Sequence, residues 1–331
     1  MMLLIATCSA IGGYEEPIWP MPAFDRWNYA FNTSPGTRGV ASTFSAWGSP
    51  YDFDNRDGQL LLGYVTDDQV TPGLPASSYQ LMSCQVQLAI SSDDLVYDAT
   101  VDDWSTHHTD GPADADAGRP TVLSGVAFRN GWNGWDFGET GAFGEAMGHG
   151  VRNCYPVDFD DNGDIRDISN NLAEAFNPNV WAVGTTDVVA PGDVLPAYTP
   201  LSFDLDLSDP SIRCAVQQAL ADGLLEFMVT SLHPASEPGS GGENAYPDWI
   251  LKENVLVDFG VAQAASLSLT LQVVPPSGVA GDANGDGLVD VEDLLSILES
   301  FGPCPCCMAD FDGSGTVDVN DLLTTIAGWS N

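Results

Sequence analysis

The sequence predicts a mainly β protein, namely an antiparallel β-sandwich of jelly-roll type with one short helix, followed by a small α-helical domain. Two observations support the β part. Short segments between about residues 14 and 274 alternate apolar and polar residues and are broken by Gly, Pro, Asn and Asp. This region also lacks the strand-helix rhythm of an α/β fold. The third observation is a change of texture after residue 274, where an acidic repeat begins.

The alternation is clearest in residues 84–90, 201–207 and 267–273. A period of two is typical of strands with one buried face. Cys84 shares its phase with Val86 and Leu88, so we expect it to be a small core residue.

One helix is expected among the strands. Asp209 is placed to cap it, Pro210 suits its first turn and Gly223 suits its end. One face of this helix is apolar: Ile212, Val216 and Leu220.

Four segments follow from these patterns. Residues 1–13 resemble the end of an export signal, 14–274 form the β-sandwich, 275–280 a stiff linker and 281–331 the C-terminal domain. Cys8 ends a weak lipoprotein-like box, which leaves lipidation open beside a plain signal. No later stretch reaches the roughly 18 apolar residues that span a bilayer. We therefore expect a secreted or surface-associated protein.

The charge is strongly negative, with 47 acidic against 9 basic residues and a net charge of −38. Such a charge repels phosphate backbones and anionic lipid surfaces, so nucleic acid and membrane partners are not expected. Cations are the natural partners, although high acidity also serves solubility or a salty medium.

The C-terminal domain contains one acidic dodecamer twice, DANGDGLVDVED from Asp282 and DFDGSGTVDVND from Asp310. Both copies match the calcium-loop template, with oxygen donors at positions 1, 3, 5, 7, 9 and 12 and Gly at 6. The expected ligands of two Ca²⁺ ions are Asp282, Asn284, Asp286, the Leu288 carbonyl, Asp290, Asp293, Asp310, Asp312, Ser314, the Thr316 carbonyl, Asp318 and Asp321. The alternative is a pair of Asp/Gly turns without metal.

Calcium has a physical task in these loops. Each loop concentrates four carboxylates, which repel one another by about 1 kcal/mol per pair even in water. The region has no Lys or Arg to offset them. A domain of about 50 residues is also near the size that needs metal or disulfide support, so we expect calcium to drive its folding.

An apolar stripe follows each loop, and the two stripes correspond at a spacing of 28 residues. The spacing predicts two helices that pack on each other through these stripes. The paired positions are Val291, Leu294, Leu295, Leu298 and Phe301, and Val319, Leu322, Leu323, Ile326 and Trp329.

The duplicated loops with Asp at position 12, each followed by one helix, resemble a type I dockerin, and FGPCPCCMAD between them resembles the linker of its GC-type variant. The resemblance implies a docking module that binds a protein receptor, cohesin-like or another surface protein, in a family often joined to polysaccharide-binding or polysaccharide-degrading proteins. Positions 10 and 11 are Val-Glu and Val-Asn, where cellulosomal dockerins often carry Ser/Thr.

Seven cysteines are present, and without Cys8 the remaining six can pair in many ways. Cys304 and Cys307 occupy the two cysteine places of the dockerin variant, which implies a disulfide that clips the linker, and Cys306 is extra. A zinc site at these three thiols is the alternative, but it lacks a fourth ligand.

Two weaker signals lie in the β region. Asp158, Asp160 and Asn162 begin like a third calcium loop, although a hairpin turning at Asn162-Gly163 explains the string equally well. Trp132 and Trp135 are candidates for a sugar-stacking platform, against ordinary core packing.

The sequence thus predicts an exported, non-enzymatic protein that joins a β-sandwich, with a role in carbohydrate binding as one option, to a Ca²⁺-dependent docking module. The alternative is a secreted glycoside hydrolase or polysaccharide lyase on a jelly-roll scaffold. The two differ in whether a groove of the sandwich gathers exposed aromatics with two carboxyls about 5 to 10 Å apart.

Overall fold

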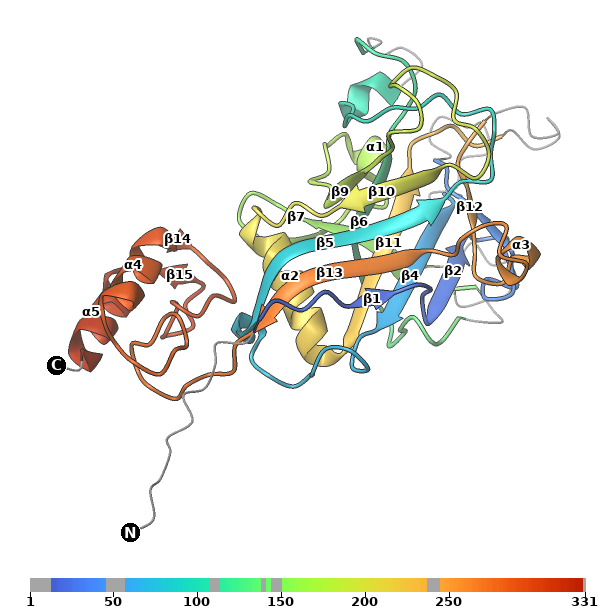
Figure 1. Ribbon diagram of the computed structural model, residues 1–331. Coiled ribbons are helices and arrows are strands. Elements are labelled where there is room, and N and C mark those ends of the chain that lie inside the picture. The colour runs from blue at the N-terminus through green and yellow to red at the C-terminus, as the bar shows by residue number, and fades with distance from the viewer. Residues whose placement is uncertain are drawn as a thin grey trace.

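The computed structural model describes residues 13–45, 57–107, 114–137, 141–143, 151–236 and 245–329. Figure 1 shows a large β region and a small helical region at the C-terminal end of the chain. The proposed leader, apart from residue 13, and Cys8 lie outside the described residues. In the part of the chain that is described, no helix has both the length and the apolar character needed to cross a membrane.

Strands outnumber helices along the chain. The strands are β1 Ile18–Trp19, β2 Phe24–Asn28, β3 Val40–Ser42, β4 Gln59–Val65, β5 Tyr79–Ala89, β6 Thr121–Phe128, β7 Cys154–Phe159, β8 Ile165–Asp167, β9 Ala182–Thr185, β10 Pro200–Asp204, β11 Leu224–Ser231, β12 Asp248–Ile250, β13 Ser266–Val273, β14 Gly302–Pro303 and β15 Thr316–Val317. The helices are η1 Ala76–Ser78, η2 Trp104–His107, α1 Asn171–Glu174, α2 Pro210–Asp222, α3 Val255–Asp258, α4 Val291–Glu299 and α5 Val319–Gly328.

The β region is built on one curled, 11-stranded sheet with the order β1-β13-β5-β10-β9-β6-β11-β4-β2, and β7 and β8 branch from β6. The paired strands of this sheet run antiparallel. β9 pairs with β10 on one side and with β6 on the other, so it joins the two halves of the sheet. The prediction of a mainly β, antiparallel fold is confirmed.

The inward positions of both halves meet in one core. In β5 and β13, Cys84 lies opposite Leu269 and Val86 opposite Leu267. These side chains share a core cluster with Leu62 and Phe227 of the other half. Cys84 is buried, as the alternation predicts, and burial raises the pKa of its thiol above the ordinary value. It is therefore a packing residue rather than a reactive one.

The second face of β4 and β11 is also covered. Leu61 and Met228 point to this side and pack with Phe24, Phe137 and Cys154 in a separate cluster. Gly63 allows this packing, because a Cβ there would lie 2.1 Å from the Phe24 ring. This half of the sheet is buried on both faces, which explains the continuous apolar run in β4.

Helix α2 confirms the expected interruption of the strands. The Asp209 carboxylate accepts hydrogen bonds from the first-turn amides, and Gly223 ends the helix in the left-handed conformation at φ 79°. Its apolar face joins the main core: Ile212, Val216 and Leu220. The helix packs against β5 and β11, which belong to opposite halves of the sheet. The prediction of a single helix in this region was incomplete, since α1 and α3 add one short turn each.

The acidic string after Cys154 forms the β7–β8 hairpin rather than an open ligand loop. Asp158 pairs with Arg166 across the hairpin, and its oxygens accept from the guanidinium at 2.9 and 2.5 Å. One Asp160 oxygen accepts from the amides of Asn162 and Asp164, which closes the turn. The hairpin explanation is thus the one that the structure supports. We do not propose an ion at Asp158, Asp160 and Asn162, because Arg166 already compensates the buried carboxylate.

Candidate metal centre

The repeated dodecamers form two turns with closely similar backbones. Gly287 and Gly315, both at position 6, have φ values of 87° and 79°, a region that favours glycine. Helix α4 or α5 begins directly after each turn. Asp290 and Asp318 at position 9 cap these helices, and each cap forms a reciprocal box with the aspartate at position 12.

The first carboxylate of each loop is tied to the middle of its own turn. The Asp282 oxygens accept from the amides of Gly285 at 2.7 Å and Gly287 at 2.8 Å. The Asp310 oxygens accept from the amides of Ser314 at 3.0 Å and Gly315 at 2.7 Å. Position 1 therefore faces the inside of the turn in both copies.

The last carboxylate reaches back over the loop. Asp293 accepts from the amides of Ala283, Asn284 and Asp290 at 2.7, 3.1 and 2.8 Å. Asp321 accepts from the amides of Phe311 and Asp318 at 2.8 and 2.9 Å. Both side chains are buried, at 0% and 1% exposure. The acids at positions 1 and 12 thus converge on the interior, as the calcium-loop template requires.

The second loop brings three carboxylates to one point. Asp310, Asp312 and Asp321 each offer an oxygen, and the three oxygens lie within 4.8 Å of one another. In the first loop the amide Asn284 takes position 3, and its side-chain nitrogen lies 3.4 Å from Asp286. A cluster of three acidic groups is not found there among the described residues.

The remaining predicted ligands lie at the rim of the loops. The Asp286 side chain accepts from the Leu288 amide, and the Ser314 hydroxyl contacts the Thr316 carbonyl at 2.9 Å. The caps Asp290 and Asp318 accept from helix amides at 2.8 and 2.7 Å. These rim groups are held in place by their own loop.

The donor set fits a hard divalent cation. All side-chain donors are oxygens, the type of ligand that Ca²⁺ takes at roughly 2.3 to 2.6 Å. A carboxylate has about four lone-pair sites, and even Asp293, which accepts three amides, keeps one of them. The amide bonds therefore position the carboxylates without using up their capacity to bind an ion.

The two helices contact each other, but most residues of the predicted apolar stripes are exposed; Leu294 and Leu322 are half-buried, and Leu322 packs against the cluster that contains Ile297. Besides the acids Asp293 and Asp321, the buried positions are Ile297 of α4 and Thr325 of α5, which correspond across the repeat. The Thr325 hydroxyl donates to the Gly281 carbonyl at 3.0 Å. Gly281 has to be small, because a Cβ there would lie 2.8 Å from the Thr325 Cα. Close backbone approach and a small apolar cluster with members from both repeats, among them Ile297 and Val317, join the repeats.

The prediction that the two helices pack on each other through their apolar stripes was therefore wrong. Four large apolar residues in each copy are 40% to 56% exposed, and they occupy matching repeat positions: Val291, Leu295, Leu298 and Phe301, and Val319, Leu323, Ile326 and Trp329. Figure 1 shows α4 and α5 beside the end of the β region where α2 lies. A helical face of this kind is left for another surface to cover.

Two disulfides hold the segment between the repeats. Cys304 pairs with Cys307, with 5.7 Å between their Cα atoms, as the resemblance implies. Cys306 pairs with Cys214 of α2 at a Cα distance of 5.3 Å and a sequence separation of 92. The sequence does not predict this second bond, because nothing near Cys214 marks it as a partner. Cys84 and Cys154 are free and buried. The pairing leaves no thiols for the alternative zinc site.

The candidate sugar platform is reduced to one side chain. Trp135 is 52% exposed and packs edge-on against Phe24 at 4.6 Å between ring centroids. Trp132 is half-buried and packs against the second core cluster. Elsewhere on the β region, a hollow is lined in part by Phe44, Asp57, Asp102, Trp104 and His107.

Comparisons with known proteins add little to this geometry. No protein-family model matches the chain, and the search of curated proteins finds no match. A search of solved structures finds an unassembled KI polyomavirus VP1 pentamer, which is 11% identical and matches over 82% of this chain and 97% of that chain, with a TM-score of 0.23. A score this low carries no argument, so the fold rests on the strand pairing described above.

Proposed function

We propose that the C-terminal region is a Ca²⁺-dependent docking module of the dockerin type, which attaches an exported β-sandwich of jelly-roll type to a protein receptor. The observation that carries the proposal is the repetition of the exposed apolar face. Four positions per copy keep large apolar side chains at the surface, whereas their neighbours Ile297 and Thr325 are buried. Partner proteins commonly cover such helical faces in a groove.

Calcium supports the docking face indirectly. Positions 9 and 12 of each loop are also the N-terminal caps of α4 and α5. An ion bound by these carboxylates fixes the start of each helix and so the orientation of its exposed face. Two bound ions also reduce the charge of the region, which has ten acidic and no basic residues between 280 and 331, from −10 to −6.

The test uses the full chain and a panel of cohesin-type receptor domains, with binding measured by biolayer interferometry in calcium and in EGTA. We expect binding that requires calcium and that Leu295→Asp with Leu323→Asp removes. Binding that is indifferent to EGTA, or a panel without any binder, contradicts the proposal. In a second outcome, two copies of the chain cover each other's apolar faces. Sedimentation of the free chain shows whether such a dimer forms.

A second candidate function concerns the hollow of the β region. It combines the aromatic residues Phe44 and Trp104 with the acids Asp57 and Asp102, a composition that suits a sugar ring and its hydroxyl groups. We propose polysaccharide binding there as the second candidate, with glycoside hydrolysis as its enzymatic variant. A glycan array with the full chain and Trp104→Ala tests binding, and release of reducing ends from the bound glycan tests hydrolysis.

A further inference from the structure

The connection between β5 and β6 holds an acidic group that neither the docking module nor the sugar-binding candidate uses as a ligand set. On its outgoing arm, Val96 forms an isolated β-bridge with Val194. Its returning arm passes close to the same place. Gly118 on the returning arm has φ 109°, and a Cβ there would lie 2.8 Å from the Val96 carbonyl oxygen and 3.1 Å from the Asp98 Cβ. Glycine thus allows the two arms to lie against each other.

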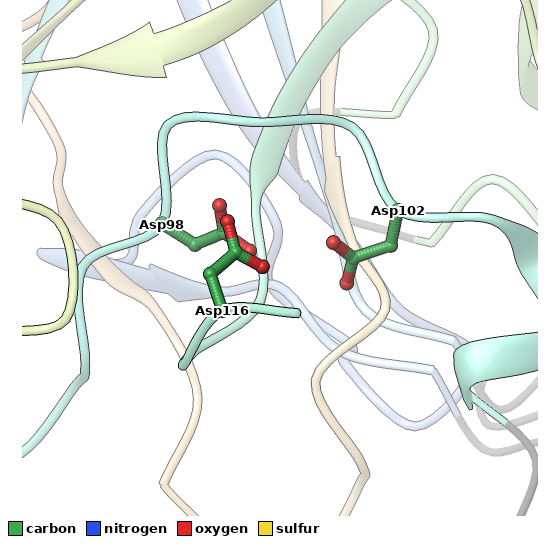
Figure 2. A group of neighbouring side chains, drawn as sticks. All are labelled: Asp98, Asp102 and Asp116. Atoms are coloured by element: carbon green, nitrogen blue, oxygen red, sulfur yellow. The ribbon is translucent and has the colours of Figure 1, made fainter. Parts of the chain in front are cut away.

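Three aspartates meet where the arms touch. Figure 2 shows Asp98 and Asp116 with adjacent carboxylates and Asp102 pointing toward them. One oxygen from each residue lies within 4.8 Å of the other two. Oxygens that share one Ca²⁺ at roughly 2.3 to 2.6 Å are at most about 5 Å apart, so the spacing suits a common ion.

The carboxylate of Asp98 is buried and only half satisfied. The residue is 4% exposed, and its Oδ1 accepts from the amide and the hydroxyl of Thr100, both at 2.9 Å. Among the described residues, its buried Oδ2 has no hydrogen-bond partner. A buried carboxylate oxygen without a partner is costly, because it has lost its hydration and gained no donor in exchange. This oxygen is part of the carboxylate that faces Asp102 and Asp116.

Asp102 shows the same deficit. It is 8% exposed, and within the described part of the chain its Oδ2 has no hydrogen-bond partner, although His107 Nε2 lies 3.6 Å away. Burial, followed by the charges of Asp98 and Asp114, raises the pKa of Asp102 to about 7, and Arg119 lowers it. The Arg119 guanidinium itself contacts His107 and the Thr106 carbonyl. Arg119 is therefore engaged by groups other than the three aspartates.

We propose that Asp98, Asp102 and Asp116 form a binding site for a hard divalent cation, with Ca²⁺ as the preferred ion, that ties the two arms of the β5–β6 connection together. The three donors are oxygens and their arrangement is irregular, which Ca²⁺ tolerates better than Mg²⁺ does. The ion takes the place of the missing partner of Asp98. It also borders the hollow of the β region, because Asp102 lines both.

The test counts Ca²⁺ ions per full chain by equilibrium dialysis. The double variant Asp98→Asn with Asp116→Asn removes two donors of the proposed site. The double variant Asp293→Asn with Asp321→Asn disables the C-terminal loops. Asp93→Asn, at an exposed position of the same connection, is the control for a lost charge. We expect the first pair to lower the count by one ion and the control to leave it unchanged. A count that the first pair leaves unchanged overturns the proposal, whatever the C-terminal loops bind.

Two measurements guard against misfolding of the double variant. Asp116 is exposed, so Asp116→Asn alone keeps the fold, and we expect it to weaken this site about tenfold or more. In the chain with disabled C-terminal loops, Ca²⁺ should slow hydrogen exchange of the amides in 96–102 and 114–120. If calcium leaves hydrogen exchange in both arms unchanged, the result contradicts the site. Mg²⁺ and Zn²⁺ serve as comparison ions.

Discussion

The C-terminal loops and the β5–β6 connection gather carboxylates in different ways. In the loops, the buried Asp282, Asp293 and Asp321 accept hydrogen bonds from amides of their own dodecamer. In the connection, Asp98 and Asp116 come from two arms, and one oxygen of Asp98 has no partner among the residues that the structure describes. In a local site, the backbone of one loop positions the carboxylates. In a site between distant segments, the carboxylates depend more on the ion to hold them together. Substitutions in both regions, and in the contacts that surround them, test this difference.

The largest effect is expected from the disulfide that joins the C-terminal repeats to helix α2 of the β region. Cys214→Ser with Cys306→Ser opens a loop with a sequence separation of 92, which the chain-entropy treatment values at about 4 to 5 kcal/mol. Cys304→Ser with Cys307→Ser opens a loop of separation 3, worth about 2 kcal/mol in the same treatment. Guanidinium unfolding followed by tryptophan fluorescence compares the two. Equal losses would show that the entropic account is wrong for this chain.

The buried position-12 acids come next. Asp293→Asn should weaken calcium binding in the first loop by about 100-fold or more, because even groups behind a ligand are worth 10- to 100-fold. Glu292→Gln, at the exposed neighbouring position, is the matched control and should change affinity less than about threefold. Calorimetric titration of the full chain measures both. Similar affinities for the two variants would contradict the assignment of Asp293 as a ligand.

The exposed stripe of α4 allows a comparison between adjacent residues. Ile297 is fully buried and Leu298 is 54% exposed. Ile297→Ala should destabilise α4 by about 2 to 5 kcal/mol, and Leu298→Ala should stay within about 0.5 kcal/mol. Hydrogen exchange of the α4 amides gives both values. A large loss in Leu298→Ala would mean that the stripe is covered within the chain, which removes the basis of the docking face.

The smallest effect concerns Glu226, a half-buried acid of the β region. Burial raises the pKa of Glu226 to about 7 from 4.5, and its Oε1 has no hydrogen-bond partner in the part of the chain that is described. The folded chain therefore favours the protonated form, and this stability is full below pH 4.5 and lost as the pH rises through 7. Glu226→Gln should gain about 2 kcal/mol at pH 8 and little at pH 4. Urea unfolding at both pH values measures it, and equal gains would exclude the titration.

Local patterns predicted much of the fold. The strands around Cys84, Phe203 and Leu269 follow from a period of two, and α2 follows from Asp209, Pro210 and Gly223. The loop geometry also follows, since Gly287 and Gly315 stand where the turn needs them. These features depend on residues that are neighbours in sequence, which is why local sequence patterns predict them.

Features that depend on distant segments were missed or mistaken. The apolar stripes of α4 and α5 suggested a buried seam, but Gly281 and Thr325 bring the backbones together and leave the stripes outside. Cys214 and Cys306 meet only because α2 lies beside the repeats. Asp98 and Asp116 stand out from the other acidic residues only once Gly118 lets their arms approach.

The central claim is that calcium organises the C-terminal repeats, and hydrogen exchange on the full chain tests it most directly. With calcium, the amides of Gly287, Gly315 and helices α4 and α5 should be protected, and EGTA should remove this protection while the core strands β5 and β13 keep theirs. Restored calcium should restore it. Protection of α4 and α5 that EGTA leaves unchanged would contradict the account, because the loops would then hold their shape through backbone hydrogen bonds alone.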